Sequence, residues 1–256
     1  MRCFLLLLVC IIAYIHAMPV DLRENSLADH AKTSSLYVEE RELLTAARAN
    51  FTFGVDVSKL HSVDVLRCAV RDMGARFFIP RGYRSSCSVD PNVVENIKNG
   101  WASGMLYVDV YMFPAPRCAK SAAQQVKELY DELEAAGVTY GVFWLDIEAA
   151  SDFWFEDKRQ NQKFLEEMLT SCKDLSLKAG IYVSHNSFDE ILGLDYHVPG
   201  NTETYSWPLW YPRYQKPADP SMSDWRPYGG FLKPNIKQYA GTTTICETGS
   251  VDLNAA

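Results

Sequence analysis

A regular alternation of strand-like and helix-like segments begins at Phe51 and continues to the end of the chain. Short apolar, β-branched or aromatic runs are separated by amphipathic stretches, and this alternation indicates a parallel sheet covered by helices. About 200 residues of this pattern suit one closed barrel. We therefore predict an α/β fold, a single irregular β/α barrel similar to a TIM barrel, with its site at the C-terminal ends of the strands.

The predicted elements follow from periodicity and from glycines where helices should end. Strands are predicted at residues 51–58, 76–84, 105–114, 141–148, 180–184, 208–214 and 234–239, and helices at 63–73, 93–103, 121–136 and 158–174. Gly74, Gly137 and Gly180 are predicted C-cap positions. Residues 201–234 show no helical pattern, so the last strands should be joined by loops.

The N-terminus differs from the barrel region. Arg2 precedes an apolar run that ends in a small-residue cleavage pattern at Ala17, so residues 1–17 are predicted to be a secretory signal. The run is too short and too early for a membrane span. Residues 18–50 are predicted to be a pro-segment or a flexible extension, and residues 51–256 the barrel domain. The protein is expected to be secreted, or to reside in the lumen of a lysosome-like compartment, with Asn50 in a glycosylation sequon.

Cysteines and charge exclude several function classes. Five cysteines remain after residue 17, and two bridges with one free thiol can be drawn in fifteen ways among Cys68, Cys87, Cys118, Cys172 and Cys246. No C-x-x-C motif is present and the chain has only five histidines, so no metal site is expected. The formal charge of −7 disfavours phosphate backbones, so we expect no nucleic-acid partner.

Two carboxyl groups stand at the end of an apolar predicted strand. Residues 141–148 read GVFWLDIE, so Asp146 and Glu148 share one face while Leu145 and Ile147 point to the helix layer. Acids at a solvated strand end are common, but these follow apolar neighbours. Repulsion between two such carboxyls keeps one acid protonated beside an ionised base. Because hydrolysis of a glycosidic bond needs that division, we predict that one carboxyl of this pair stays protonated and the other is ionised.

Acids and aromatic rings recur at other strand ends. Asp56 falls at the end of the first predicted strand and Asp252 at the end of the last, and closure of the barrel makes these strands neighbours. Either acid alone is explained as a cap or turn residue, but together with the pair they favour a site. Flat aromatic rings pack on sugar rings, so we predict a groove that binds sugar; the alternative is that these rings belong to the barrel core. The aromatic residues are Tyr83, Tyr111, Phe113, Trp144, Trp210 and Tyr239, and Asp109 is a further acid among them.

Six motifs occur in the order seen in the Chalaropsis-type lysozymes, glycoside hydrolase family 25, and the chain resembles the branch found in protists and nematodes. The motifs are FGVDVS at 53–58, WLDIE at 144–148, GIYVS at 180–184, PLWY at 208–211, KPNIKQY at 233–239 and VDLN at 251–254. The resemblance covers residues 51–254, nearly all of the predicted barrel domain.

The resemblance implies an N-acetylmuramidase that hydrolyses the β-1,4 linkage between N-acetylmuramic acid and N-acetylglucosamine in bacterial peptidoglycan. It implies that Glu148 is the general acid, that Asp146 orients the acetamido group of the substrate and that Asp56 supports them. Residues assigned to substrate binding are Asp252, Tyr111, Trp210, Gln238 and Tyr239. It implies no cofactor, and we expect a monomer whose partner is peptidoglycan, without a membrane partner.

Some residues depart from the family pattern. Ala149 stands where this branch usually has glycine and is expected to tighten the turn behind Glu148, and Lys59 and Leu60 also differ from the residues that relatives often carry. A chitinase-type barrel is one alternative, but its Asp-x-Asp-x-Glu pattern would need an acid at Trp144. The other is a catalytically weak or inactive wall-binding or regulatory protein. Activity is expected to peak on the acidic side of neutral, because it falls when Glu148 loses its proton.

Overall fold

The computed structural model describes residues 51–246 and 249–256, in which Thr52–Ala256 form one compact unit. The signal predicted at 1–17, the extension at 18–50 and the Asn50 sequon lie outside the described residues, so those assignments stay predictions.

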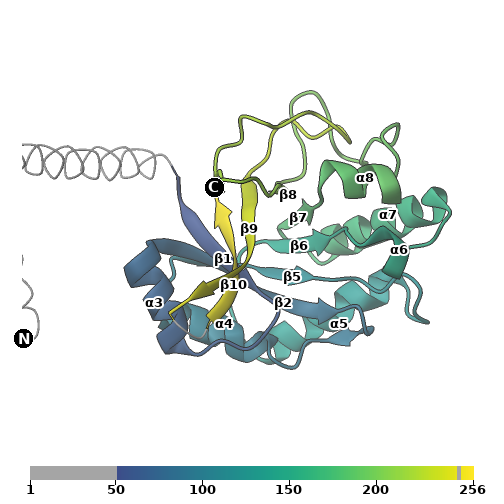
Figure 1. Cartoon of the computed structure of the whole chain (residues 1–256). Helices are drawn as coiled ribbons and strands as arrows, with labels where there is room; N and C mark the ends of the chain where they lie inside the picture. Colours follow the sequence, from purple (N-terminus) through teal and green to yellow (C-terminus); the bar gives the residue numbers. More distant parts are fainter. Residues whose placement is uncertain (1–50, 247–248) are drawn as a thin grey trace, which may run out of the picture. The chain divides into compact units, whose positions relative to one another are not determined.

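Eight strands close a barrel, with helices packed around it (Figure 1). In order around the ring they are β1 (Phe53–Val57), β2 (Ala75–Arg84), β5 (Val110–Met112), β6 (Phe143–Asp146), β7 (Ala179–Tyr182), β8 (Leu209–Pro212), β9 (Ile236–Ile245) and β10 (Gly249–Ala255), which returns to β1. The short strands β3 (Ser88–Val89) and β4 (Tyr107–Val108) pair with β2. The predicted irregular barrel is therefore confirmed.

The closing strand runs against the others. The ring strands β1, β2 and β5 to β9 are parallel to their neighbours, whereas β10 is antiparallel to both β9 and β1. The connection from Ile245 to Gly249 is too short for the crossover that a parallel pair needs. We expected Asp252 at the end of the last strand, but it lies in the middle of β10. The register nevertheless pairs its Cα with that of Asp56.

Four helices match the prediction to within one residue at each end: α3 (Val63–Met73), α4 (Val93–Ala102), α5 (Ala122–Ala135) and α7 (Lys158–Asp174). Gly74 is the left-handed C-cap of α3, and Gly137 follows the end of α5 with φ +61°. Gly180 is not a cap, and this prediction was wrong. It lies inside β7, where an added Cβ would come within 2.4 Å of the Trp144 ring.

Two helices were not predicted. α6 (Ala150–Phe153) and α8 (His185–Ile191) have only one or two turns, so they give too few repeats for a 3.6-residue period to show. Both follow strands that end at the mouth of the barrel. As expected, no helix separates β8 from β9 in the described chain, and a long loop joins them.

Apolar side chains form two separate clusters. The larger lies between strands and helices and includes Leu145 and Ile147, which point outward from β6 as predicted. The smaller fills the barrel interior, and its buried members are Phe77, Ile79, Tyr111, Trp144, Tyr182, Trp210 and Ile236. Because successive residues of a strand alternate between these layers, Asp146 faces the interior.

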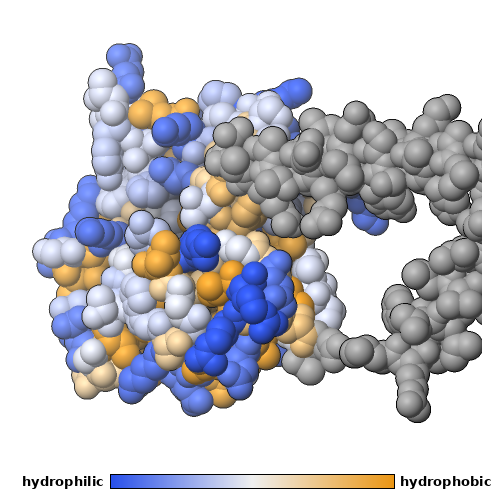
Figure 2. Space-filling model, turned by 90° about the vertical axis from the view of Figure 1, so that its left-hand side faces the viewer, coloured by the Kyte–Doolittle hydropathy of each residue, from blue (hydrophilic) through white to orange (hydrophobic). Residues whose placement is uncertain are grey.

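The outer surface is of mixed hydropathy. On the face drawn in Figure 2, hydrophobic residues lie in small groups among hydrophilic ones. Among the described residues, no helix has the length and apolar character needed to cross a bilayer.

Two disulfides select one pairing from the fifteen. Cys68 on α3 bonds to Cys246 after β9, across a sequence separation of 178 residues, and Cys87 bonds to Cys118. The first bridge joins the first described helix to the closing hairpin, so it restricts the unfolded chain over nearly the whole domain. Cys172 on α7 is the free thiol, and it is buried.

We predict that Cys172 does not react in the folded protein. Burial raises the pKa of its thiol to about 12, so almost no nucleophilic thiolate forms near neutral pH. Alkylation by iodoacetamide without reductant, followed by mass spectrometry, should leave the native protein unmodified and add one label at Cys172 after denaturation. Rapid labelling of the native protein would contradict the burial of this thiol.

Candidate active site

β6 carries the acidic pair into the mouth of the barrel. Asp146 is the last residue of the strand, and Glu148 lies two residues beyond it in the turn before α6. Asp146 is buried, whereas Glu148 is half-buried and reaches further towards solvent. Ala149 adopts φ +56°, a left-handed conformation that costs less for glycine. The alanine therefore strains the turn that holds Glu148.

A second acidic pair comes from the strands that close the barrel. Asp56 on β1 accepts hydrogen bonds from Gln238 Nε2 at 2.9 Å and from Asn254 Nδ2 at 2.7 Å. Asp252 on β10 accepts one from the Thr242 backbone N–H at 2.6 Å. Gln238 Nε2 also lies 3.4 Å from Asp252 Oδ2, so one amide bridges the two acids.

Hydroxyl and indole groups orient these amides. Gln238 Oε1 accepts hydrogen bonds from Tyr182 Oη at 2.8 Å and from Tyr214 Oη at 2.5 Å, which directs its NH₂ group at the acids. Trp210 Nε1 donates to Asn254 Oδ1 at 2.8 Å and fixes that amide in the same way. Four strands thus cooperate to hold one buried carboxylate.

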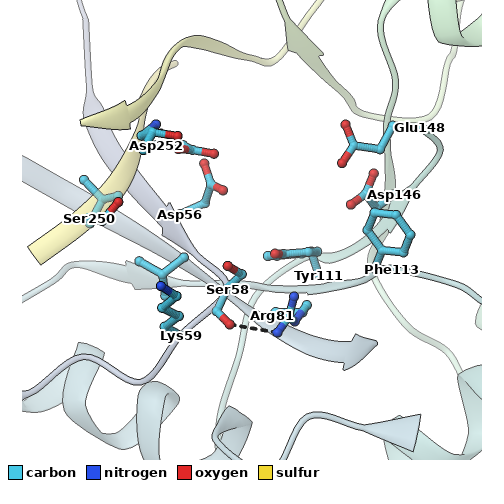
Figure 3. A pocket seen from close by; sticks show the side chains of 13 residues that line it. Asp56, Ser58, Lys59, Arg81, Tyr111, Phe113, Asp146, Glu148, Ser250 and Asp252 are labelled. Atoms are coloured by element: carbon cyan, nitrogen blue, oxygen red, sulfur yellow. Dashed lines mark hydrogen bonds between the residues drawn. The ribbon is translucent and has the colours of Figure 1, made fainter. Parts of the chain in front are cut away.

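A cavity of about 410 Å³ opens between the two acidic pairs, and a smaller one of about 110 Å³ adjoins it and shares all four acids. In Figure 3, Asp56 and Asp252 lie on one side of the space and Asp146 and Glu148 on the other. The larger cavity is lined by Asp56, Val57, Ser58, Lys59, Arg81, Tyr111, Phe113, Asp146, Glu148, Thr242, Ser250, Val251 and Asp252. The site predicted at the barrel mouth is therefore a real concave space.

Aromatic rings form the floor of the site. The Trp210 ring meets Tyr111, Trp144 and Tyr182 edge-on, with centroids 6.1, 5.8 and 4.6 Å away. Tyr111 and Trp210 line the cavities, as their substrate-binding assignment requires. Trp144 is held deeper, with Nε1 donating to Asp109 Oδ2 at 2.9 Å.

Two predicted rim residues lie elsewhere. Tyr83 faces the helix layer, where its hydroxyl donates to Glu128 at 3.0 Å, so it is not a rim residue. The ring of Tyr239 packs edge-on against Phe53 at 6.3 Å, and Tyr239 lines neither cavity. Its position gives the proposed contact with substrate no support. Gln238, its neighbour, points the other way and does line the smaller cavity.

Sequence reasoning missed Arg81, Tyr182 and Tyr214. Arg81 lines the cavity from β2, donating from Nε to Asp90 at 2.8 Å and from Nη2 to the Ser58 carbonyl at 2.8 Å. An arginine in the middle of a predicted barrel strand was a usable signal, because a buried charge needs a partner. Tyr214 follows β8 in a loop and had no comparable signal.

Burial raises the pKa of all four acids, and the charges of neighbouring acids add to the rise for three of them. Burial, and then the charge of Asp252, raise the pKa of Asp56 from 3.8 to about 7. Burial, followed by the charges of Glu148 and Asp56, raises the pKa of Asp146 well above its usual value, while Arg81 opposes the shift. Burial and the charge of Asp252 raise the pKa of Glu148 as well. Burial also raises the pKa of Asp252.

These shifts revise the predicted division of protons. We expected an ionised Asp146 beside a protonated Glu148, but Asp146 is the more deeply buried of the two, and its pKa is raised as well as that of Glu148. Within the described residues its Oδ1 atom is buried without a hydrogen-bond partner. Burial and the charges of Glu148 and Asp56 therefore favour a proton on Asp146 also, and a donor at Oδ1 would be needed to favour its carboxylate.

Paired carboxyls with raised pKa values, set over aromatic rings at the mouth of a β/α barrel, define the site of a glycoside hydrolase. One side can deliver a proton while the other stabilises positive charge on a sugar ring. No step of this chemistry requires a metal or cofactor.

Comparisons with known proteins agree with this class. A family model described as "Lysozyme-like protein 1" matches residues 47–239. Lysozyme-like protein 5 of Caenorhabditis elegans is 40% identical over 203 residues, which are 78% of this chain and 89% of that protein. Probable GH family 25 lysozyme 2 of Dictyostelium discoideum is 35% identical over 201 residues, again 78% of this chain and 89% of that protein. The chain belongs to the lysozyme-like proteins of glycoside hydrolase family 25.

Solved structures share the fold at lower identity. The bacterial lysozyme from Streptomyces coelicolor has a TM-score of 0.59 at 19% identity, covering 79% of this chain and 90% of that one. The modular Cpl-1 endolysin, solved with a tetrasaccharide-pentapeptide peptidoglycan analogue, has a TM-score of 0.56 at 15% identity and covers 80% of this chain and 53% of that one.

Replacing Asp146 by asparagine should stabilise the protein above neutral pH. Because the pKa of Asp146 is higher in the folded than in the unfolded state, its contribution to stability is greatest near or below pH 4 and is lost as pH rises through its folded pKa. The neutral amide has no charge to bury. Thermal unfolding followed by circular dichroism from pH 4 to 8 should show curves that converge at low pH and separate by several degrees at pH 8.

The exposed Asp195→Asn variant controls for the amide substitution and should follow the wild type at every pH. If Asp146→Asn were less stable than the wild type at pH 8, the prediction would be wrong, because burial of the Asp146 charge would not be the main loss of folding stability at this position.

Proposed function

We propose that this protein is a secreted lysozyme that hydrolyses the β-1,4 linkage between N-acetylmuramic acid and N-acetylglucosamine in bacterial peptidoglycan. The observation that carries the proposal is the cavity between two acidic pairs, with Glu148 at its more open edge and Asp146 beneath. Membership of the family supports peptidoglycan as the substrate.

Glu148 is the proposed general acid. Its pKa is raised by burial and by Asp252, so it keeps a proton at mildly acidic pH, and its half-buried position lets it reach a linkage bound across the cavity. Protonation of the glycosidic oxygen makes the departing sugar a better leaving group.

Asp146 is proposed to hold the acetamido group of the sugar on the other side of the broken bond. An amide N–H from that group would donate to the unpartnered Oδ1 atom and favour the ionised carboxylate. The acetamido carbonyl is then held against the anomeric carbon, where it can displace the leaving group. Substrate would therefore supply a hydrogen bond that no described residue donates.

Asp56 and Asp252 are proposed to stabilise the positive charge that develops on the sugar ring. Their carboxyls lie opposite the acidic pair across the cavity, and Gln238 and Asn254 hold Asp56 in place. Tyr111 and Trp210 offer ring surface to the sugar from below. Burial is the largest cause of the raised pKa of Glu148, and the charge of Asp252 is the second.

The proposed location is outside the cell or in the lumen of a lysosome-like compartment. Two disulfides fit an oxidising environment, and the signal predicted at residues 1–17 fits entry into the secretory route.

Glu148→Gln should lower turnover of purified bacterial walls by about 10²–10⁴-fold, because the amide cannot donate the proton that the leaving group needs. Loss of turbidity measures the rate, and analysis of the products should find new reducing ends on the muramic sugar. Glu132→Gln, an exposed change of the same type on α5, is the matched control and should retain full activity. Walls cleared equally by both variants would rule out Glu148 as the acid, and wall binding without clearance by the wild type would favour a non-enzymatic role.

The rate should be highest on the acidic side of neutral. As pH rises through the raised pKa of Glu148, the general acid loses its proton and turnover falls. Ionisation of Asp56, whose pKa is about 7, adds negative charge that stabilises the cationic sugar ring, so the loss of the Glu148 proton alone accounts for the expected fall. The pH profile of kcat/KM on solubilised glycan checks this, and a rate that continues to rise above pH 8 would contradict the acid assignment.

A further inference from the structure

A second cavity of about 500 Å³ lies beside the barrel mouth and shares no lining residue with the catalytic cavities. We call it the outer pocket, and its lining is His185, Asn186, Tyr211, Arg213, Ser223, Asp224, Trp225 and Arg226. The residues come from the start of α8, from β8 and from the loop between β8 and β9. The proposed cleavage of the glycan backbone uses none of them.

β8 separates the outer pocket from the catalytic cavity. Trp210 and Tyr214 line the catalytic side, whereas Tyr211 and Arg213 line the outer pocket. These residues alternate along one strand and its continuation, so the two spaces lie on opposite faces of the same segment. His185 follows the C-terminal end of β7, and Arg213 follows that of β8, so the outer pocket stands at the same end of the barrel as the catalytic site.

The outer pocket carries excess positive charge. Lys237 is fully buried beneath it and donates to Asp224 Oδ1 at 3.2 Å, to the Ser221 carbonyl and to Gln215. Asp224 is therefore already engaged as the counterion of a buried lysine. Arg213 Nε lies 3.3 Å from the other oxygen of Asp224, and Arg226 has no hydrogen bond or ion pair among the described residues. The lining of the outer pocket thus holds two arginines and a single carboxylate, and Lys237 already engages that carboxylate.

The two arginines act on the same space. Their charges both lower the pKa of Tyr211, against the larger effects of burial and of Asp224, which raise it. Trp225 meets the Tyr211 ring edge-on at 5.5 Å and forms an apolar wall. Exposed guanidinium groups beside an aromatic wall are suited to a carboxylate on a short organic chain, because guanidinium binds carboxylate through paired hydrogen bonds.

We propose that the outer pocket binds the carboxylates of the peptide stem of peptidoglycan while the glycan lies in the catalytic cavity. This inference rests on the proposed function, since the stem is attached to the muramic sugar. Neighbouring layers of a protein pack about 10 Å apart, and an extended peptide of four or five residues spans about 13–17 Å. A stem that leaves a bound muramic sugar can therefore pass over the end of β8 and reach Arg213 and Arg226.

The test compares one glycan with and without its stems. kcat/KM of the wild type, Arg213→Gln, Arg226→Gln and the double variant is measured on purified walls freed of phosphate polymers and on the same walls after an amidase has removed the peptides. The double variant should lose about tenfold on stem-bearing walls and nothing on stem-free glycan, because only the stem reaches the pocket. The matched control is Arg76→Gln, an exposed change at the start of β2 and therefore at the end of the barrel away from the outer pocket. This variant should behave as the wild type on both substrates.

Equal losses on both substrates, or no loss on either, would overturn the proposal, and thermal unfolding of each variant excludes misfolding as the cause. A loss that appears only on walls that retain phosphate polymers would assign the pocket to phosphate instead, which also overturns it. If the wild type cleaves neither substrate, the proposed function fails. Calorimetric titration with the free stem pentapeptide then still tests the outer pocket. The double variant should bind the peptide at least tenfold more weakly than the wild type. Equal binding by the two proteins would reject the proposal.

Discussion

The pairing of β10 with β1 is the constraint on which the rest of the site depends. It closes the ring of strands, and its antiparallel register places Asp252 directly opposite Asp56. Without closure, Asp56 would stand at the edge of an open sheet, where water could solvate it. The Cys68–Cys246 bridge fastens the hairpin that supplies β10 to the first described helix. The covalent link and the sheet pairing therefore protect the same closure.

Closure has an electrostatic cost that the interior only partly offsets. Four acids share one cavity, and burial raises the pKa of each. Gln238 and Asn254 supply hydrogen bonds to Asp56, whereas Asp146 keeps one oxygen without a donor in the described chain. A fold selected for stability alone would place an amide or an apolar residue there. The buried acid that lowers the stability of the barrel is thus the same residue that is proposed to accept a hydrogen bond from the substrate, which is the expected relation between strain and binding in an enzyme.

The fold and the acidic residues were largely predictable because both depend on local periodicity. Strands with buried runs and helices with clear caps appeared at the expected positions, and alternation along residues 141–148 correctly turned Leu145 and Ile147 outward and Asp146 inward. The reversed direction of β10 was not predicted, because a motif alone does not show strand direction. Likewise, Gly180 satisfies the composition rule for a cap but is needed for another reason, the approach of the Trp144 ring.

Contacts between distant segments were beyond the reach of sequence reasoning. The link from Tyr214 to Gln238 and the link from Lys237 to Asp224 both join β9 to the loop after β8, and that loop has no period to read. The same loop determines what each face of β8 meets. Because Trp210 and Tyr211 are adjacent in sequence, a single strand presents the Trp210 ring to the catalytic cavity and the Tyr211 ring to the outer pocket on its other side. A polymer that carries both sugars and charged peptides is the kind of ligand for which two such faces would be useful together.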